Sequence, residues 1–422
     1  MLNAQENGTI DERLDALVRR QRPGFSLDRE LYTADWVFKL DLQRIFARNW
    51  LMAGHSCEIP NPGDYFLFQI GDDSLIVIRG DDGRVNALYN TCRHRGSIIC
   101  EQESGHAGKL VCPYHQWVFD RDGSLRAARH MSADFCKEHY ALQKAHCREL
   151  GGLIFICGAA DAPDFETPAR IIAPQLKPHG LEQAKIAFFA DYKIEANWKV
   201  IFENNRECYH CATKHPQYCA TNFDLGTPGD DRTNDAYDAA CAEKQRHWRD
   251  IGVPVDPVSF PGESWYRCDR VALQPGCVSE TIDGQPAVQK LMGDFTERDM
   301  GSFRLITLPN FWSQASGDYW MSMSLSPLAP QLTRARVWWL VHKDAKEGVD
   351  YDVNRLTEVW KATNEQDWKL SVDNQRGINS SRYTPGPYST LAERGVDRFD
   401  RWYLRQISSA DVAVPDVEKA RH

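Results

Sequence analysis

The sequence predicts an α+β protein with two domains, an all-β domain followed by an antiparallel sheet with helices packed on it. Three observations lead to this prediction. The chain has 422 residues, which is more than one hydrophobic core usually supports. Short strand-like runs separated by tight turns occupy residues 64–157. Longer strand candidates, together with two helical segments, follow from about residue 160.

Composition and charge exclude several classes of function. Fifty Lys and Arg stand against 59 Asp and Glu, a net charge of −9 without a basic stripe, so binding of nucleic acid or an anionic membrane is not expected. Residues 1–24 contain no apolar core of a signal peptide, and no run of about 20 apolar residues could span a bilayer. We therefore expect a cytoplasmic protein, whose thirteen cysteines stay reduced rather than forming disulfides.

The first domain is predicted over residues 46–160, after an N-terminal helical segment (1–45) that packs with the second domain. Its strands are expected in the runs DYFLFQI, SLIVIRG, RVNALYN and GGLIFICG. The run WVFDRDGSLRA is a hairpin candidate because Asp122-Gly123 favours a two-residue turn. The polar, proline-bearing residues 158–168 are interpreted as the connector to the second domain.

The second domain is predicted over residues 161–422. Its long strands are expected in KIAFFADYKIEA, YWMSMSLSPL and ARVWWLVHK. One helix is expected to run from about Asn197 through His210, and another from about Val349 to Gln375. Residues 228–262 are polar and give no clear assignment.

A first metal motif lies in the β domain. Cys92 and His94 form C-x-H, and Cys112 and His115 form C-x-x-H after 17 intervening residues. One thiolate and one imidazole from each loop suit a [2Fe–2S] cluster with two Cys on one iron and two His on the other. A Cys2His2 zinc site is the alternative, but zinc fingers usually pair Cys with Cys and His with His, and the strand-rich context disfavours it.

A second metal motif lies in the first predicted helix. Glu203, Glu207 and His210 are spaced i, i+4 and i+7 and would share one face of a continuous helix. His215 immediately precedes Pro216, where a helix should end. His210 and His215 could be two unrelated surface histidines, but the flanking carboxylates favour a metal site.

The third ligand is expected from the second helix. Its apolar stripe includes a carboxylate: Leu356, Trp360, Thr363, Asp367 and Leu370. Burying Asp367 is costly without a charged partner such as a metal ion, whereas Glu365 falls on the solvated face. Two His and one carboxylate with open positions are the ligands of non-haem Fe(II) oxygenases.

With these two motifs and the run ENNRECYHCATKHP, residues 45–380 resemble the α-subunit of Rieske non-haem iron oxygenases. The resemblance implies a helix-grip-like catalytic domain, a cluster on Cys92, His94, Cys112 and His115, and a mononuclear iron on His210, His215 and Asp367. It also implies a homotrimer in which electrons cross between subunits through an acidic residue, here Glu207. We expect Glu207 to reach both imidazoles.

The resemblance extends to a branch of that family. Most ring-hydroxylating members have Asp at the position of Glu207, whereas Glu is similar to the branch that acts on quaternary ammonium compounds. NWKVIFENNRECYHC, WLVHKDAKEGVDYDV and NQRGINSSRYTPGPYS resemble the glycine betaine and proline betaine (stachydrine) demethylases. This implies hydroxylation of an N-methyl carbon and release of formaldehyde, with O2 and with electrons from NAD(P)H through a separate flavin and iron–sulfur reductase.

A trimethylammonium group would need aromatic faces. Six aromatic residues of the second half are candidates, although each is more often core: Phe260, Trp265, Tyr266, Phe303, Trp312 and Trp320. The sequence does not single out an Arg or Lys for a substrate carboxylate. Two other functions stay open: a Rieske oxygenase acting on an aromatic or other carbon substrate (ring hydroxylation or O-demethylation), and a Rieske ferredoxin fused to an inactive binding domain.

Overall fold

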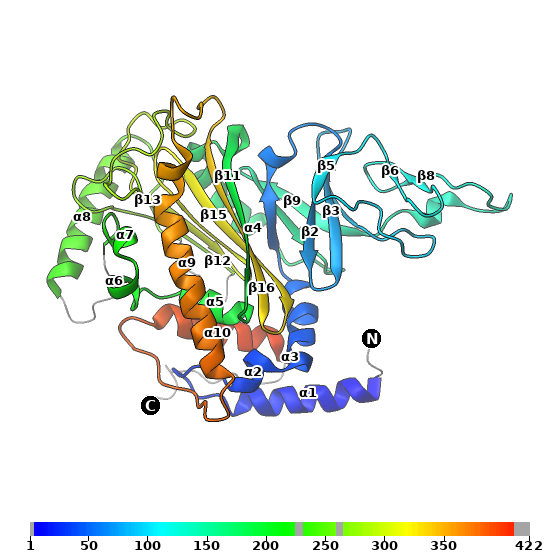
Figure 1. The fold of residues 1–422 in the computed structure, drawn as a ribbon, viewed down its shortest axis with the longest axis horizontal. Coiled ribbons are helices and arrows are strands. Elements are labelled where there is room, and N and C mark those ends of the chain that lie inside the picture. Colours follow the sequence, from blue (N-terminus) through cyan, green and yellow to red (C-terminus); the bar gives the residue numbers. More distant parts are fainter. Residues whose placement is uncertain (1–3, 224–230, 259–264, 409–422) are drawn as a thin grey trace.

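The computed structural model describes residues 4–223, 231–258 and 265–408, and its first half is built on a seven-stranded antiparallel sheet (Figure 1). The strand order is β1-β10-β9-β4-β3-β2-β5. The strands are β1 (Leu51–His55), β2 (Asp64–Ile70), β3 (Asp73–Arg79), β4 (Val85–Tyr89), β5 (Ser104–His106), β9 (Lys144–Leu150) and β10 (Leu153–Cys157). The four strands predicted in this region are therefore confirmed.

A small three-stranded sheet extends from this half to one end of the molecule's long axis (Figure 1). It consists of β6 (Leu110–Val111), β7 (Val118–Phe119) and β8 (Leu125–Ala127). The predicted hairpin is present between β7 and β8, but its turn has three residues (121–123) instead of the expected two, because the amide of Asp120 donates a hydrogen bond to the carbonyl of Ser124. There Gly123 has a φ of 85°, a left-handed conformation that glycine adopts without strain, and Asp122 accepts a hydrogen bond from the amide of Ser124.

The second half is built on a six-stranded antiparallel sheet with the order β11-β16-β15-β14-β13-β12. The strands are β11 (Ala184–Ile194), β12 (Tyr266–Val271), β13 (Ser302–Thr307), β14 (Phe311–Ala315), β15 (Trp320–Ala329) and β16 (Leu332–His342). β15 and β16 are central and almost wholly buried, which explains their long apolar runs. The side chain of Asn310 joins the two halves by hydrogen bonds to both the backbone N–H and C=O of Met52.

Helices cover the second sheet, and the longest, α9 (Val353–Ile378), crosses it diagonally (Figure 1). The remaining helices of this half are α4 (Glu166–Leu176), α5 (Trp198–Asn204), α6 (Cys211–Lys214), α7 (Pro216–Cys219), α8 (Asp231–Asp250) and α10 (Arg394–Ile407). α9 begins at Val353, four residues after the predicted start. The side chain of Asp352 caps this end by accepting a hydrogen bond from the amide of Arg355. No helix within the described ranges is long and apolar enough to cross a membrane.

The N-terminal helices are joined to the second half through a buried polar network. They are α1 (Ala4–Arg19), α2 (Arg29–Thr33) and α3 (Asp35–Leu40), followed by a π-helical turn (Asp41–Phe46). Asp41 forms a fully buried ion pair with Lys199 at 2.5 Å and accepts hydrogen bonds from Trp198 and Tyr403. These contacts tie the start of the chain to α5 and α10, and α5 leads directly into the predicted metal-binding segment.

Candidate metal centres

Two matched β-loops present the four predicted cluster ligands at the outer end of the first half. In each loop the cysteine carbonyl accepts a hydrogen bond from the amide four residues later, Gly96 for Cys92 and Gln116 for Cys112. Both of these later residues have positive φ angles, 80° and 59°. The two loops therefore share one backbone path although their sequences differ, and Gly96 provides the left-handed conformation without strain.

The side chains of these loops fit a [2Fe–2S] group. Cys92 and Cys112 are both buried with free thiols, and burial together with the nearby Cys112 thiol raises the pKa of Cys92. Two adjacent buried thiols can both become thiolates only when a cationic centre neutralises them. The imidazoles of His94 and His115 lie 4.6 Å apart between ring centroids, and His94 stacks on Trp117. The loops thus bring together two soft donors inside and two imidazoles at the surface.

The segment that carries the other predicted ligands is not one continuous helix. α5 ends at Asn204, the chain turns through residues 205–210, and the one-turn helix α6 starts after His210. The prediction that Glu203 shares a helix face with His210 is therefore wrong. Glu203 instead accepts a hydrogen bond from Tyr32 in the interior. The two consecutive Asn residues explain the break, because Asn side chains compete for backbone hydrogen bonds and disfavour a helix interior.

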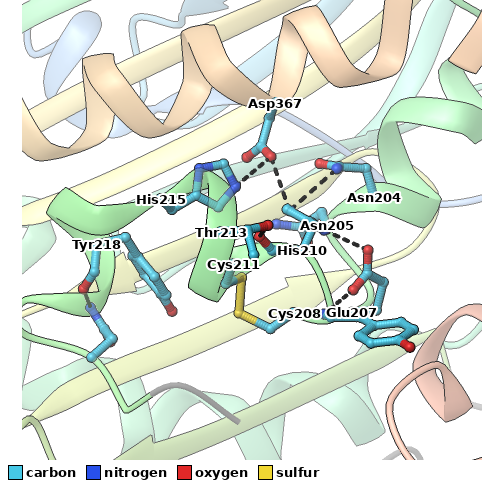
Figure 2. Close-up of a disulfide and its surroundings, with 12 residues drawn as sticks. Asn204, Asn205, Glu207, Cys208, His210, Cys211, Thr213, His215, Tyr218 and Asp367 are labelled. Atoms are coloured by element: carbon cyan, nitrogen blue, oxygen red, sulfur yellow. Dashed lines mark hydrogen bonds and ion pairs between the residues drawn. A yellow bond between two sulfur atoms is a disulfide. The ribbon is translucent and has the colours of Figure 1, made fainter. Parts of the chain in front are cut away.

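Three predicted donors converge where this segment meets α9. Asp367 points from α9 toward His210 and His215, with its Oδ1 at 3.2 Å and 2.9 Å from their Nε2 atoms (Figure 2). The rings of His210 and His215 are nearly perpendicular, with centroids 4.9 Å apart. Glu365, two residues before Asp367, is exposed as expected. Donor atoms in neighbouring positions around a metal with bonds of about 2.1 Å lie about 3 Å apart, as these do.

Each imidazole is oriented by a different partner at Nδ1. Glu207 Oε1 lies 2.6 Å from Nδ1 of His210. The prediction that Glu207 reaches both imidazoles is wrong, because Gln366 Oε1 lies 2.7 Å from Nδ1 of His215 and takes that place. Asn204, whose amide nitrogen lies 3.4 Å from Nε2 of His210, was also missed. The only signal for Gln366 was its position beside Asp367 on α9.

This arrangement fits a metal ion. An imidazole that donates its Nδ1 proton presents a lone pair at Nε2. His215 Nε2 and Asp367 Oδ1 are buried and close together, yet neither has a partner with hydrogen-bond geometry among the described residues. Burial alone would lower the pKa of His210, but the carboxylates of Asp367 and Glu207 raise it to about 9. The site thus attracts positive charge, and two imidazoles with one carboxylate suit Fe(II).

A disulfide joins Cys208 and Cys211, which contradicts the expectation that all cysteines stay reduced. The bond closes a four-residue ring that contains His210 and lies on the side of this imidazole away from Asp367 (Figure 2). Cys211 lies within 4.8 Å of donor atoms of both histidines, but its sulfur is in the disulfide and offers no thiolate. The nearness of two cysteines three positions apart on a turn explains why the bond forms.

A cavity of about 340 Å³ opens beside the three converging donors, a size suited to a small molecule. Its walls come from α5–α7, from α9 and from β12, β13 and β14 of the sheet. Aromatic side chains from three of these elements face it: Tyr218, Trp312 and Trp360. The cavity combines aromatic faces with the open side of the three converging donors.

Among the aromatic candidates that the structure describes, only Trp312 lines this cavity. Phe303 and Trp320 are buried against His179 in the core. Tyr266 belongs to the same core cluster, and Trp265, which contacts Tyr266, is partly buried and packs against that cluster. Phe260 lies outside the described residues. Tyr218 and Trp360 were not singled out, although Tyr218 follows His215 by three residues and Trp360 lies on the same stripe of α9 as Asp367.

Comparison with known proteins identifies both halves of the chain. Residues 49–144 match the Rieske [2Fe-2S] domain, and residues 185–409 match the ring hydroxylating alpha subunit (catalytic domain). The glycine betaine monooxygenase oxygenase subunit of Pseudomonas aeruginosa is 42% identical over 392 residues, 93% of this chain and 91% of the relative. The corresponding subunit of Chromohalobacter salexigens is 41% identical over 418 residues, 99% and 92% of the two chains.

Solved structures share the fold. The quaternary ammonium Rieske monooxygenase CntA superposes with a TM-score of 0.71 at 21% identity, covering 93% of this chain and 98% of CntA. Naphthalene 1,2-dioxygenase from Rhodococcus sp. superposes with a TM-score of 0.67 at 18% identity, covering 96% and 99%. The chain therefore belongs to the Rieske oxygenases, oxidoreductases with a Rieske [2Fe–2S] domain and a catalytic domain that holds a mononuclear iron.

Proposed function

We propose that this chain is the oxygenase component of a monooxygenase that removes an N-methyl group from a quaternary ammonium betaine. One observation carries the proposal: the chain is 41–42% identical, over more than nine-tenths of its length, to glycine betaine monooxygenase oxygenase subunits of two bacteria. In the reaction, O2, two electrons and two protons convert N–CH3 to N–CH2OH and water. The carbinolamine then loses formaldehyde and a proton and leaves a tertiary amine.

We assign the two sets of donors to the two iron groups. Cys92, Cys112, His94 and His115 would hold the cluster, which is supported by their two matched loops. His210, His215 and Asp367 would hold the mononuclear iron, which is supported by the convergence of their donor atoms. When bound, the cluster supplies electrons and the mononuclear iron supplies O2 activation. A ferredoxin fused to an inactive binding domain would have no need of the second set.

The residues of the chain have defined tasks in this reaction. Glu207 and Gln366 fix the tautomer and direction of the two imidazoles, so that both Nε2 atoms face Asp367. Tyr218, Trp312 and Trp360 provide low-dielectric aromatic faces that replace the hydration of a trimethylammonium group. The cavity therefore positions a methyl carbon beside the open side of the metal site.

We further propose a homotrimer in which the cluster of one subunit serves the iron of its neighbour. The sheet β6–β8 with the cluster loops lies at one end of the long axis, whereas α6 and α7 lie toward the other (Figure 1). Tyr114 in the second cluster loop is 56% exposed and Tyr209 near Glu207 is 53% exposed, so each end has an aromatic side chain available to a neighbouring subunit. Glu207 would bridge the two centres across that contact.

A separate reductase supplies electrons from NAD(P)H, and placement in the cytoplasm stays a prediction.

A substrate panel tests the proposal. The purified protein, loaded with its cluster and Fe(II), is combined with a reductase and NADH, and O2 uptake is measured together with formaldehyde and ring diols. Formaldehyde formation with glycine betaine or proline betaine, equal to the O2 consumed, is the expected result. Hydroxylation of an aromatic substrate without turnover of any betaine would overturn it.

A further inference from the structure

The cavity beside the metal site carries an excess of positive charge. Three arginines line it: Arg206 at the turn after α5, Arg267 on β12 and Arg304 on β13. The carboxylates of Glu207 and Asp367 are engaged by the two imidazoles, which leaves Asp269 on β12 as the remaining carboxylate of the lining. Three guanidinium groups thus face one carboxylate.

Two of these arginines have their charge balanced within the described structure. Arg267 forms an ion pair with Asp269 at 2.6 Å. Asp269 also lies directly opposite Arg304 in the β12–β13 register. Arg304 donates hydrogen bonds to Tyr218 and Asn222. Burial alone would lower its pKa, but the nearby Tyr218, Asp269 and Glu280 stabilise the charged form and raise the pKa above its usual value.

Arg206 differs from both. Among the described residues, the guanidinium of Arg206 donates a hydrogen bond only to the backbone carbonyl of Asn205, and its Nε, like that of Arg304, is buried without a partner. It stacks over Phe202 at 5.5 Å and forms no ion pair with any residue that the structure describes. Burial and the like charges of Arg267 and Arg398 lower its pKa to about 9, and the opposing effect of Asp269, whose carboxylate is paired with Arg267, does not outweigh them. A partly buried guanidinium among other cations is a group that lacks its anion.

We propose that Arg206 binds the carboxylate of the substrate, and so selects quaternary ammonium compounds that carry an acid group. This inference rests on the proposed function and adds a specificity-determining residue to it. In a betaine such as glycine betaine, one methylene separates the ammonium nitrogen from the carboxylate carbon. The anion site must therefore lie close to the metal site, and Arg206 immediately precedes Glu207, the partner of His210. The planar guanidinium offers two parallel donors to a carboxylate.

Glycine betaine and choline separate this role from a general role in folding. Choline has the same trimethylammonium group but a hydroxymethyl group in place of the carboxylate. Affinities are measured by calorimetry without O2, on protein that holds its cluster and Fe(II). Arg206→Gln should weaken glycine betaine binding by about 10- to 100-fold, the value of a lost charged hydrogen-bond pair. Choline binding should not weaken, because removing a cation cannot reduce attraction for another cation.

Three further variants complete the test. Arg206→Lys keeps the charge but loses the planar fork, so its affinity for glycine betaine should lie between those of the wild type and Arg206→Gln. Arg304→Gln removes a cation of the same cavity, and exposed Arg376→Gln controls for changes in net charge. An unchanged ratio of glycine betaine to choline affinity in Arg206→Gln overturns the inference, as does a collapse of that ratio in Arg304→Gln alone.

The outcome also distinguishes this inference from the function on which it rests. If the wild type releases formaldehyde from betaines while Arg206→Gln keeps the wild-type preference, only the role of Arg206 is wrong. If the wild type neither binds nor demethylates any betaine, the proposed function itself fails. Iron content and thermal unfolding of Arg206→Gln show whether the fold is retained, and Arg206→Lys carries the test if it is not.

Discussion

Gln366 holds the imidazole of His215 from the side opposite Asp367. Its Oε1 lies 2.7 Å from Nδ1, while Oδ1 of Asp367 lies 2.9 Å from Nε2 of the same ring. Two consecutive residues of α9 thus contact the two nitrogens of one imidazole. Gln366 accepts the proton on Nδ1, which leaves Nε2 with a lone pair that can bind a metal ion.

Replacing Gln366 by Leu should weaken binding of the mononuclear iron by about 10- to 100-fold, because His215 loses the partner that fixes its tautomer. The visible absorption of the cluster should not change. Iron titration monitored by metal analysis measures the effect, and Gln366→Glu, which keeps an acceptor oxygen, should retain more affinity than the Leu variant. Wild-type iron affinity in Gln366→Leu would show that the contact has no orienting role.

Asp367→Ala should remove the mononuclear iron and leave the cluster in place. The two histidines alone provide two donors, which is one short of the set that Fe(II) oxygenases use. Iron content should fall from about three to about two per chain, while the EPR signal of the reduced cluster persists. Retention of the third iron would mean that another residue provides the carboxylate.

Glu207→Gln should retain both metal groups but slow product formation by about 10- to 100-fold. The amide oxygen still accepts the Nδ1 proton of His210, but the charge that stabilises this imidazole is lost. Single-turnover experiments with the reduced cluster measure the rate, and Glu207→Asp should recover part of it. Unchanged turnover in Glu207→Gln would refute the bridging role.

A pair of buried acids should make stability depend on pH. Burial raises the pKa of Glu203 to about 8 and that of Asp400 well above its usual range. Between about pH 4.5 and pH 8 the folded protein keeps a proton that the unfolded chain releases, so the free energy of unfolding falls as the pH rises.

Glu203→Gln removes one of these acids and should flatten the decline. The midpoint of urea unfolding, measured at several pH values between about 5 and 8, gives the slope. Glu365→Gln, a change at an exposed position of α9, serves as the matched control. The prediction fails if the Glu203 variant and the wild type lose stability with pH at the same rate.

The disulfide predicts a definite thiol count. Thirteen cysteines less the two in the Cys208–Cys211 bond leave eleven reactive thiols in protein that is denatured and freed of metal without a reductant. Reduction should raise the count to thirteen. Peptide mapping after alkylation identifies the protected pair, and thirteen thiols before reduction would show that the bond does not form in the isolated protein.

Residue type and spacing were enough to predict the strands and the apolar stripe of α9, because these patterns are local. The path of residues 203–210 was not predictable in the same way. A Cβ at Gly395 would clash with the carbonyl oxygen of Arg206, so α10 packs directly on this turn. That contact joins residues far apart in the chain, and so does the contact of Gln366 with His215. Neither has a local signature in the sequence.

The proposed iron donors come from two parts of the chain that are about 150 residues apart, the α6–α7 segment and α9. An iron bound there acts as a cross-link that closes a long chain loop, and such links restrict the unfolded chain. Heat resistance of the second half should therefore follow the free iron concentration. The elements joined by this link are also walls of the substrate cavity, so chelation would loosen the cavity and the metal site together.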